Sequence, residues 1–155
     1  DRQRQGFTLG LGAGISHITS SDYATASDDG ELAFTPSLSL GIGVTPSTVL
    51  SLNLSESIYT ARADNDTWIF TATVGARRFL QSGSNALHVG AGVGVLFDAA
   101  RTYDGTPPTA GCLGELSVGY LFGHLDTRLQ LQTGQECLES DTLTLLTLSV
   151  GYLFF

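Results

Sequence analysis

The segment LHVGAGVGVLF, residues 87–97, alternates large apolar side chains with small ones at every second position. Successive side chains of a β-strand point to opposite faces, so this period of two predicts a strand and not a helix. One face of the predicted strand is apolar throughout, whereas glycine fills most of the other. The segment also has the length that a tilted strand needs to cross a bilayer.

The same alternation extends over the rest of the chain. Seven further segments alternate, at residues 7–16, 32–44, 50–55, 68–77, 115–122, 125–132 and 146–154. No run of about 18 apolar residues exists that could form a transmembrane helix. Together the eight segments predict a single all-β domain, residues 1–155, with antiparallel strands in up-and-down order.

The second face of these strands distinguishes a membrane barrel from a soluble β-sandwich, which also alternates. A soluble sandwich would place Lys, Glu and Arg on that face. Here Gly, Ser and Thr predominate, only 14% of the residues are charged and Lys is absent. Small side chains suit the narrow interior of a barrel, and closure leaves no unpaired strand edge in lipid. We therefore predict a closed eight-stranded transmembrane β-barrel.

Aromatic residues flank the apolar face at both of its margins. Two such girdles are typical of the interfaces of a lipid-facing band. The predicted girdles consist of Phe34, Trp68 and Phe97 at one margin, and of Phe7, Tyr120, Phe122, Tyr152 and Phe154 at the other.

The connections between the predicted strands are alternately tight and more polar. Residues 45–48, 81–85 and 123–124 form the tight ones. Outer-membrane barrels have short periplasmic turns and longer outer loops, so we expect both termini in the periplasm. The absence of Met predicts a processed start, for which a removed secretory signal peptide is the expected cause.

The net charge of −8 argues against a nucleic-acid partner, because phosphates need a basic face. Much of this acidity lies in the longer connections, which favours a solvated rim. The alternative is a divalent-cation site, for which Asp28, Asp29 and Glu31 are the best candidates. These residues lack a cation-loop pattern, so no metal and no cofactor is predicted.

Two segments carry a family resemblance. LHVGAGVG at 87–94 and VGYLFF at 150–155 resemble strands of the small outer-membrane barrels of Gram-negative bacteria, the group that includes the OmpA transmembrane domain and OmpX. The resemblance implies contact with outer-membrane lipid and lipopolysaccharide. It also implies that the barrel-assembly machinery reads the closing strand through Tyr152, Phe154 and Phe155. Members of this group include anchors, adhesins and lipid-modifying enzymes, so the fold alone assigns no role.

Charged side chains on the small-residue face are expected to point into the lumen, where a buried Arg must be paired. Glu115 and Arg128 lie on adjacent predicted strands, which favours an ion pair or a small network. Such a network would stabilise the barrel, or else serve as a gate or a proton path. The full predicted set is Glu115, Asp126, Arg128, Gln130, Gln132 and Glu136.

Glu56 breaks the alternation, because strict continuation after Leu54 sends it toward lipid. A β-bulge at Ser55-Glu56 would turn Glu56 inward and would place Tyr59 in the outer girdle. We expect this bulge.

No catalytic motif is present. Lipid-modifying barrels use His with Ser or an acid near the membrane surface, and the residues that could supply such a set are Ser16, His17, Ser20 and Asp22. The simpler interpretation of His17 is an interfacial side chain. His88 and His124 lack Cys or His partners at metal-ligand spacing.

Cys112 and Cys137 are expected to form a disulfide in the oxidising periplasm. The strands that carry them form a hairpin around Gly123-His124, with a loop of two or four residues. A four-residue loop places the two cysteines directly opposite each other, whereas a two-residue loop offsets them by two positions. The disulfide therefore favours the four-residue loop.

Short outer loops and a filled lumen favour a structural, anchoring or partner-binding role, such as the membrane subunit of an envelope assembly. The first alternative is a narrow channel for small solutes or ions. The second alternative is a lipid-modifying enzyme.

Overall fold

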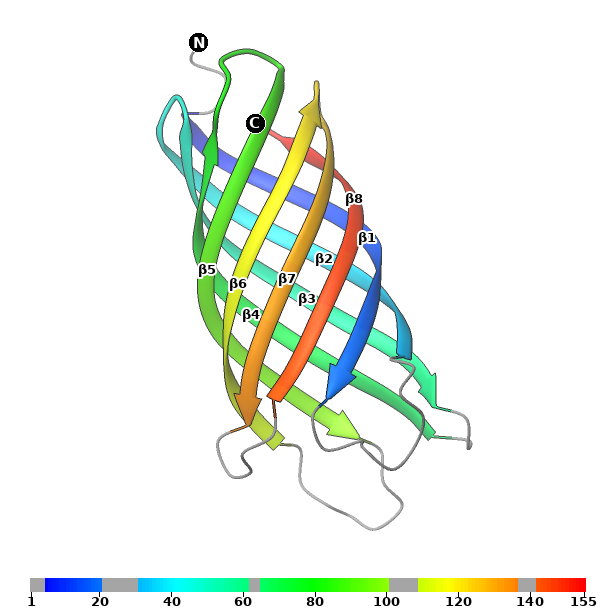
Figure 1. Cartoon of the computed structure of the whole chain (residues 1–155). Coiled ribbons are helices and arrows are strands. Elements are labelled where there is room, and N and C mark those ends of the chain that lie inside the picture. Colours follow the sequence, from blue (N-terminus) through cyan, green and yellow to red (C-terminus); the bar gives the residue numbers. More distant parts are fainter. Residues whose placement is uncertain (1–4, 21–30, 62–64, 101–108, 137–141) are drawn as a thin grey trace.

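The computed structural model describes residues 5–20, 31–61, 65–100, 109–136 and 142–155. Eight β-strands close into one antiparallel barrel (Figure 1), which confirms the predicted fold class. The described residues contain no helix long and apolar enough to span a membrane. The strands are β1 (Gly6–Ser20), β2 (Glu31–Thr45), β3 (Thr48–Ala61), β4 (Asn65–Phe79), β5 (Asn85–Ala100), β6 (Thr109–Phe122), β7 (Leu125–Glu136) and β8 (Thr142–Phe154).

Each strand pairs with its neighbours in the chain, and β1 pairs with β8 to close the barrel. β1 begins and β8 ends at the same end, which we call the turn end because residues 46–47, 80–84 and 123–124 connect strands there. The other end is called the far end. Tracing paired residues once around from Gly10 returns to β1 at Ser20, a shear of ten residues toward the far end. A shear of this kind tilts the strands by about 40°.

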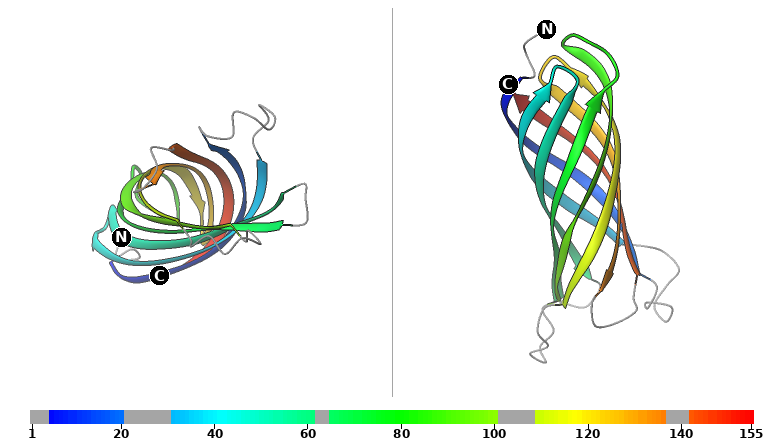
Figure 2. Two further views of the ribbon diagram at one scale, coloured as in Figure 1. Left: turned by 90° about the horizontal axis from the view of Figure 1, so that it is seen from below. Right: turned by 90° about the vertical axis from the view of Figure 1, so that its left-hand side faces the viewer.

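The barrel is flattened into two four-stranded halves. Figure 1 shows β5 to β8 crossing in front of β1 to β4, and the view from below in Figure 2 shows an elongated outline. The two halves meet at the β4–β5 and β8–β1 seams, which glycines line. A Cβ added at Gly75 would lie 2.5 Å from the carbonyl oxygen of Ala91, and one at Gly14 would lie 2.5 Å from that of Leu148. Only glycine therefore permits these seams to bend so closely.

The outer wall carries the apolar band that the alternation predicts. Val93 is 70% exposed and Leu148 is 63% exposed, although both are aliphatic. The predicted girdle residues also lie on the outer wall, with Phe34, Trp68 and Phe97 toward the far end and with Phe7, Tyr120, Phe122, Tyr152 and Phe154 toward the turn end. An outer surface this apolar matches a lipid-facing wall.

The lumen contains two apolar clusters, one near each end. Both consist of buried side chains from strands on opposite sides of the barrel. The far cluster consists of Ile18, Ala33, Ile69, Leu96, Leu113, Leu143 and Leu145. The turn cluster consists of Val49, Phe79, Ala86, Leu121 and Leu153.

Two sequence predictions about strand register are wrong. β3 and β4 pair without interruption from Thr48 to Ala61, so no bulge exists at Ser55-Glu56 and Glu56 faces outward. Glu56 lies on the far-end half of the wall, on the inner side of the girdle residue Trp68. In the β6–β7 hairpin Phe122 pairs with Leu125. The loop therefore has two residues. Gly123 adopts a positive φ of 62°, which permits this tight turn.

Candidate functional site

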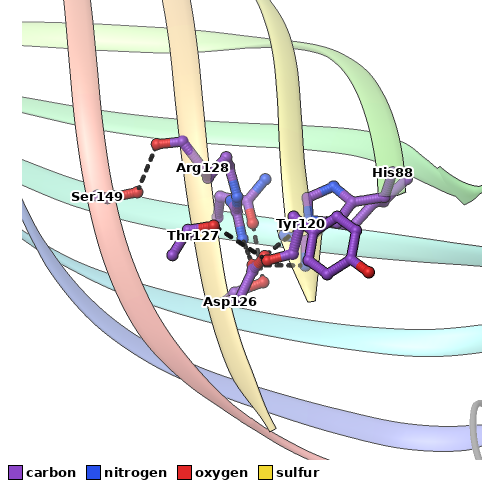
Figure 3. Close-up of polar contacts among 9 residues, drawn as sticks. His88, Tyr120, Asp126, Thr127, Arg128 and Ser149 are labelled. Carbon is purple, nitrogen blue, oxygen red and sulfur yellow. Dashed lines mark hydrogen bonds and ion pairs between the residues drawn. The ribbon is translucent and has the colours of Figure 1, made fainter. Parts of the chain in front are cut away.

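A buried charged cluster lies in the lumen next to the turn cluster, and Asp126 is its centre. Asp126 is 3% exposed and accepts contacts on both carboxylate oxygens. Arg77 Nη1 lies 3.3 Å from Oδ2, and Arg128 Nη2 lies 2.8 Å from the same oxygen. His88 Nε2 lies 2.7 Å from Oδ1. Figure 3 shows His88 and Arg128 converging on Asp126.

Arg77 and His88 were not among the lumen residues predicted from the sequence. Both occupy inward positions of the alternation, on β4 and β5, so the parity of their strands could have identified them. The sequence prediction considered only partners on neighbouring strands. In the closed barrel, side chains from β4 and β5 meet Asp126 of β7, because eight strands leave a lumen that side chains can span.

Arg128 pairs with Asp126, one of the carboxylates of the predicted network, and not with Glu115, which occupies a separate part of the lumen. Glu115 Oε2 accepts hydrogen bonds from Thr73 Oγ1 at 2.6 Å and from Gln132 Nε2 at 3.3 Å. The register explains this difference, because Glu115 pairs with Gln132 and Arg128 pairs with Gly119. Four residues along a strand separate the two levels by about 13 Å.

Hydroxyl side chains connect the strands through the middle of the lumen. Ser16 Oγ shares 2.6 Å hydrogen bonds with Thr35 Oγ1 and with Thr147 Oγ1, and Thr35 Oγ1 shares a 3.0 Å bond with Ser57. These bonds link four strands from β8 through β1 and β2 to β3. Each buried hydroxyl thereby gains a partner within the barrel, as a buried polar group requires.

A small cavity of about 30 Å³ adjoins the charged cluster. A space of this size holds one or two water molecules. It is lined on one side by Gly12, Ser37 and Asn53, and on the other by Arg128 and Gln130. The small side chains of β1 and β2 therefore leave this space opposite the long side chains of β7.

The formal charges of the described lumen residues balance, since the lumen contains two arginines, Arg77 and Arg128, and two carboxylates, Asp126 and Glu115. Two buried nitrogens, His88 Nδ1 and Arg128 Nε, have no hydrogen-bond partner among these residues. Glu136 ends β7, and its side chain lies outside the described part of the structure. The arrangement braces β4, β5 and β7 against one another.

The catalytic candidates are not brought together. Ser16 is fully buried in the lumen, whereas the next residue, His17, is exposed on the outer wall. The barrel wall separates the two side chains, so they cannot form a nucleophile and base pair. The Ser20 side chain and Asp22 lie outside the described residues.

No metal site is found in the described ranges, where no group of three His, Cys, Asp or Glu side chains could hold a metal ion. Asp28 and Asp29 fall outside these ranges, and Glu31 is described only as the first residue of β2.

The closing strand is held by the turn between β6 and β7. His124 Nδ1 donates a hydrogen bond to the carbonyl oxygen of Leu153 at 2.8 Å, and the Leu153 amide donates to the carbonyl oxygen of His124 at 2.7 Å. The His124 ring stacks on Tyr152 at 5.3 Å and lies 6.0 Å from Phe155. Tyr152 also packs on Phe154 at 4.7 Å. All three residues of the expected assembly signal thus belong to one aromatic group at the turn end.

Cys112 is exposed on the outer wall of β6 and pairs with Gln135, while Cys137 lies outside the described residues. The two-residue turn places Gln135 opposite Cys112, so the four-residue loop inferred from the cysteines is wrong. The disulfide itself stays a prediction.

No protein-family model and no curated protein sequence matches this chain. Solved structures match its fold. Neisserial surface protein A aligns with a TM-score of 0.73 at 11% identity, over 97% of this chain and 98% of that chain. The fold is that of a small outer-membrane β-barrel. This confirms the resemblance seen in the sequence.

Other small barrels align over similar lengths. The attachment invasion locus protein Ail of Yersinia pestis has a TM-score of 0.65 at 12% identity, covering 97% of this chain and 99% of that chain. The outer membrane enzyme PagL has a TM-score of 0.62 at 9% identity, covering 94% and 98%. At these identities the likeness shows the fold alone, so the role must be argued from the site.

Proposed function

We propose that this chain is a non-conducting integral barrel of the bacterial outer membrane, with a structural, anchoring or partner-binding role. The observation that carries this proposal is the filling of the lumen. An apolar cluster lies near each end, and the charged cluster and hydroxyl bonds occupy the space between them. A solute or ion would have to displace both apolar clusters to pass through.

Membrane residence is supported by the exposed apolar wall and by the two girdles. By analogy with known outer-membrane barrels, the turn end faces the periplasm, which places the start of β1 and the end of β8 there. Thiol labelling of a Ser47→Cys variant in a Cys112→Ser, Cys137→Ser background tests this orientation. Labelling by an impermeant reagent only after the outer membrane is permeabilised is the expected result.

Planar-bilayer recording tests the absence of conduction. We expect no large, steady conductance from the wild-type barrel. Opening one end alone, with Phe79→Ala and Leu121→Ala in the turn cluster, should still give none because the far cluster remains. Steady porin-like openings of the wild-type protein would refute the proposal.

A narrow channel is the second candidate, and the cavity beside Arg128 is the observation that favours it. Gly12 lines this cavity, so a Gly12→Phe variant would fill it. A small wild-type conductance that Gly12→Phe abolishes would establish the channel and would exclude a purely structural barrel.

A further inference from the structure

The outer wall of β1 to β3 carries two ionisable side chains that nothing in the described structure pairs. Glu56 is half-buried on the outer wall of β3, and His17 is exposed on the outer wall of β1. Neither makes a hydrogen bond or an ion pair with another described residue. Thr127, another outward polar residue, is satisfied differently, since its hydroxyl donates to the carbonyl oxygen of Tyr120 at 3.1 Å.

Glu56 lies within the apolar band and not beyond it. Its ladder partner on β4 is Phe70, and the next outward residue toward the far end, Ile58, pairs with Trp68 of the girdle. On its other side, Glu56 faces Pro36, because Ser37 pairs with Ser55 and the register is kept. A carboxylate at this depth is costly in lipid unless a partner group reaches it.

His17 and Glu56 lie at nearly the same depth. Ile15 and Ile58 both pair with Phe34 of β2, and the shear of ten residues in eight steps raises Ile58 about 2.5 residues above Ile15 toward the far end. His17 lies two residues beyond Ile15, and Glu56 lies two residues short of Ile58. The two side chains therefore differ in depth by only about 4 Å.

The two residues flank β2 symmetrically, so a single symmetric contact would satisfy both. We propose that the outer wall of β1 to β3 is the interface of a homodimer, in which His17 of each copy binds Glu56 of the other. A two-fold axis along the membrane normal in front of β2 brings β1 of one copy against β3 of the other. This isologous arrangement keeps each residue at its own depth and forms the same pair twice.

The shape of the barrel suits this contact. β1 to β4 form one broad half of the flattened barrel, at the back in Figure 1. Leu38, Leu40 and Leu54 cover the centre of this surface and are only half-buried, so they would pack against their counterparts. The inference rests on the proposed membrane residence, because the cost of an unpaired Glu56 arises in lipid.

Cross-linking tests the reciprocal pairing. One batch carries His17→Cys and another carries Glu56→Cys, each with Cys112→Ser and Cys137→Ser, and the two are reconstituted together in phosphatidylcholine vesicles. The mixture should form cross-linked dimers, whereas each variant alone should not. Cross-linking of either variant with itself would overturn the proposed geometry.

Exchanging the two side chains tests whether the His17–Glu56 pair is required for dimer formation. Single-molecule photobleaching in vesicles should show two copies for the wild type and mostly one for His17→Glu, which opposes two carboxylates. The double variant His17→Glu, Glu56→His should restore two copies. Arg78→Gln, on the outer wall of β4 toward the turn end, is the control that should leave two copies.

Flotation with vesicles distinguishes failure of the proposed membrane residence from failure of the proposed dimer. A chain that does not float with vesicles contradicts membrane residence itself. A chain that floats as single copies overturns only the dimer. Stability that depends on ethanolamine headgroups in such a monomer would assign Glu56 to lipid instead of a second copy.

Discussion

Among the single residues of this barrel, Asp126 has the most concentrated set of contacts, since three basic side chains depend on it. Replacing it with Ala leaves Arg77 and Arg128 buried without a carboxylate partner. We expect Asp126→Ala to lower the free energy of unfolding by about 3 kcal/mol or more, measured by urea titration in detergent micelles. Gln130→Ala, two inward positions further along β7, should change it by about 0.5 kcal/mol or less. Equal effects would show that the cluster adds no stability.

Gly119 provides the space that His88 occupies. A Cβ added at Gly119 would lie 2.6 Å from His88 Cε1 and would also meet the carbonyl oxygen of Thr127. Gly119→Ala should therefore destabilise the barrel by about 1–3 kcal/mol through overpacking. Gly114 of the same strand has nothing within 4 Å of such an atom, so Gly114→Ala is the matched control. A Gly119→Ala barrel with an unchanged thermal unfolding midpoint would contradict the close approach.

The sequence predicts which of these residues face the lumen but not which side chains they contact. Parity alone places Asp126 and Arg128 inside, and the structure agrees. The contacts of Asp126 with Arg77 and His88 cross the lumen between strands far apart in the chain. They depend on the radius and shear of the closed barrel, which no local pattern contains.

At the scale of elements, the β6–β7 hairpin shows that alternation predicts the face of each side chain but not the strand register. Loops of two and four residues keep every side chain on the same face, so parity could not choose between them. The observed turn pairs Cys112 with Gln135. Glu56 was misplaced because the expected bulge assumed that an ionisable side chain must leave the outer wall, whereas β3 and β4 keep an uninterrupted ladder through it.

This register predicts a specific cross-link. A Gln135→Cys, Cys137→Ser variant should form a disulfide with Cys112, since directly opposed residues bring their Cβ atoms within about 5.5 Å. Mass spectrometry of peptides digested without reduction detects the bond. Thr133→Cys in the same background is the offset control, which should stay reduced. Oxidation of the Thr133 variant in preference to the Gln135 variant would contradict the register.

The whole molecule contains one tryptophan, and its position reports how the barrel sits in lipid. Trp68 is 39% exposed in the far-end girdle. We expect lipids brominated close to the headgroup to quench its fluorescence more than lipids brominated near the chain end, as for an interfacial ring. In a Trp68→Phe, Val93→Trp variant the order should reverse, because Val93 lies near the middle of the exposed band. Strong quenching of Trp68 by aqueous iodide would place it outside the membrane.

The glycine-lined seams divide the barrel where the chain also divides. Strands β1 to β4 and β5 to β8 are each continuous in sequence, and residues 80–84 alone join them at the β4–β5 seam. Each half contributes side chains to both apolar clusters, so neither half can bury its inner surface by itself. A backbone cut at Gly83 would thus create two complementary fragments with matching unpaired edges. Such fragments could serve as a split reporter whose reassembly in a bilayer restores one barrel from two separately made chains.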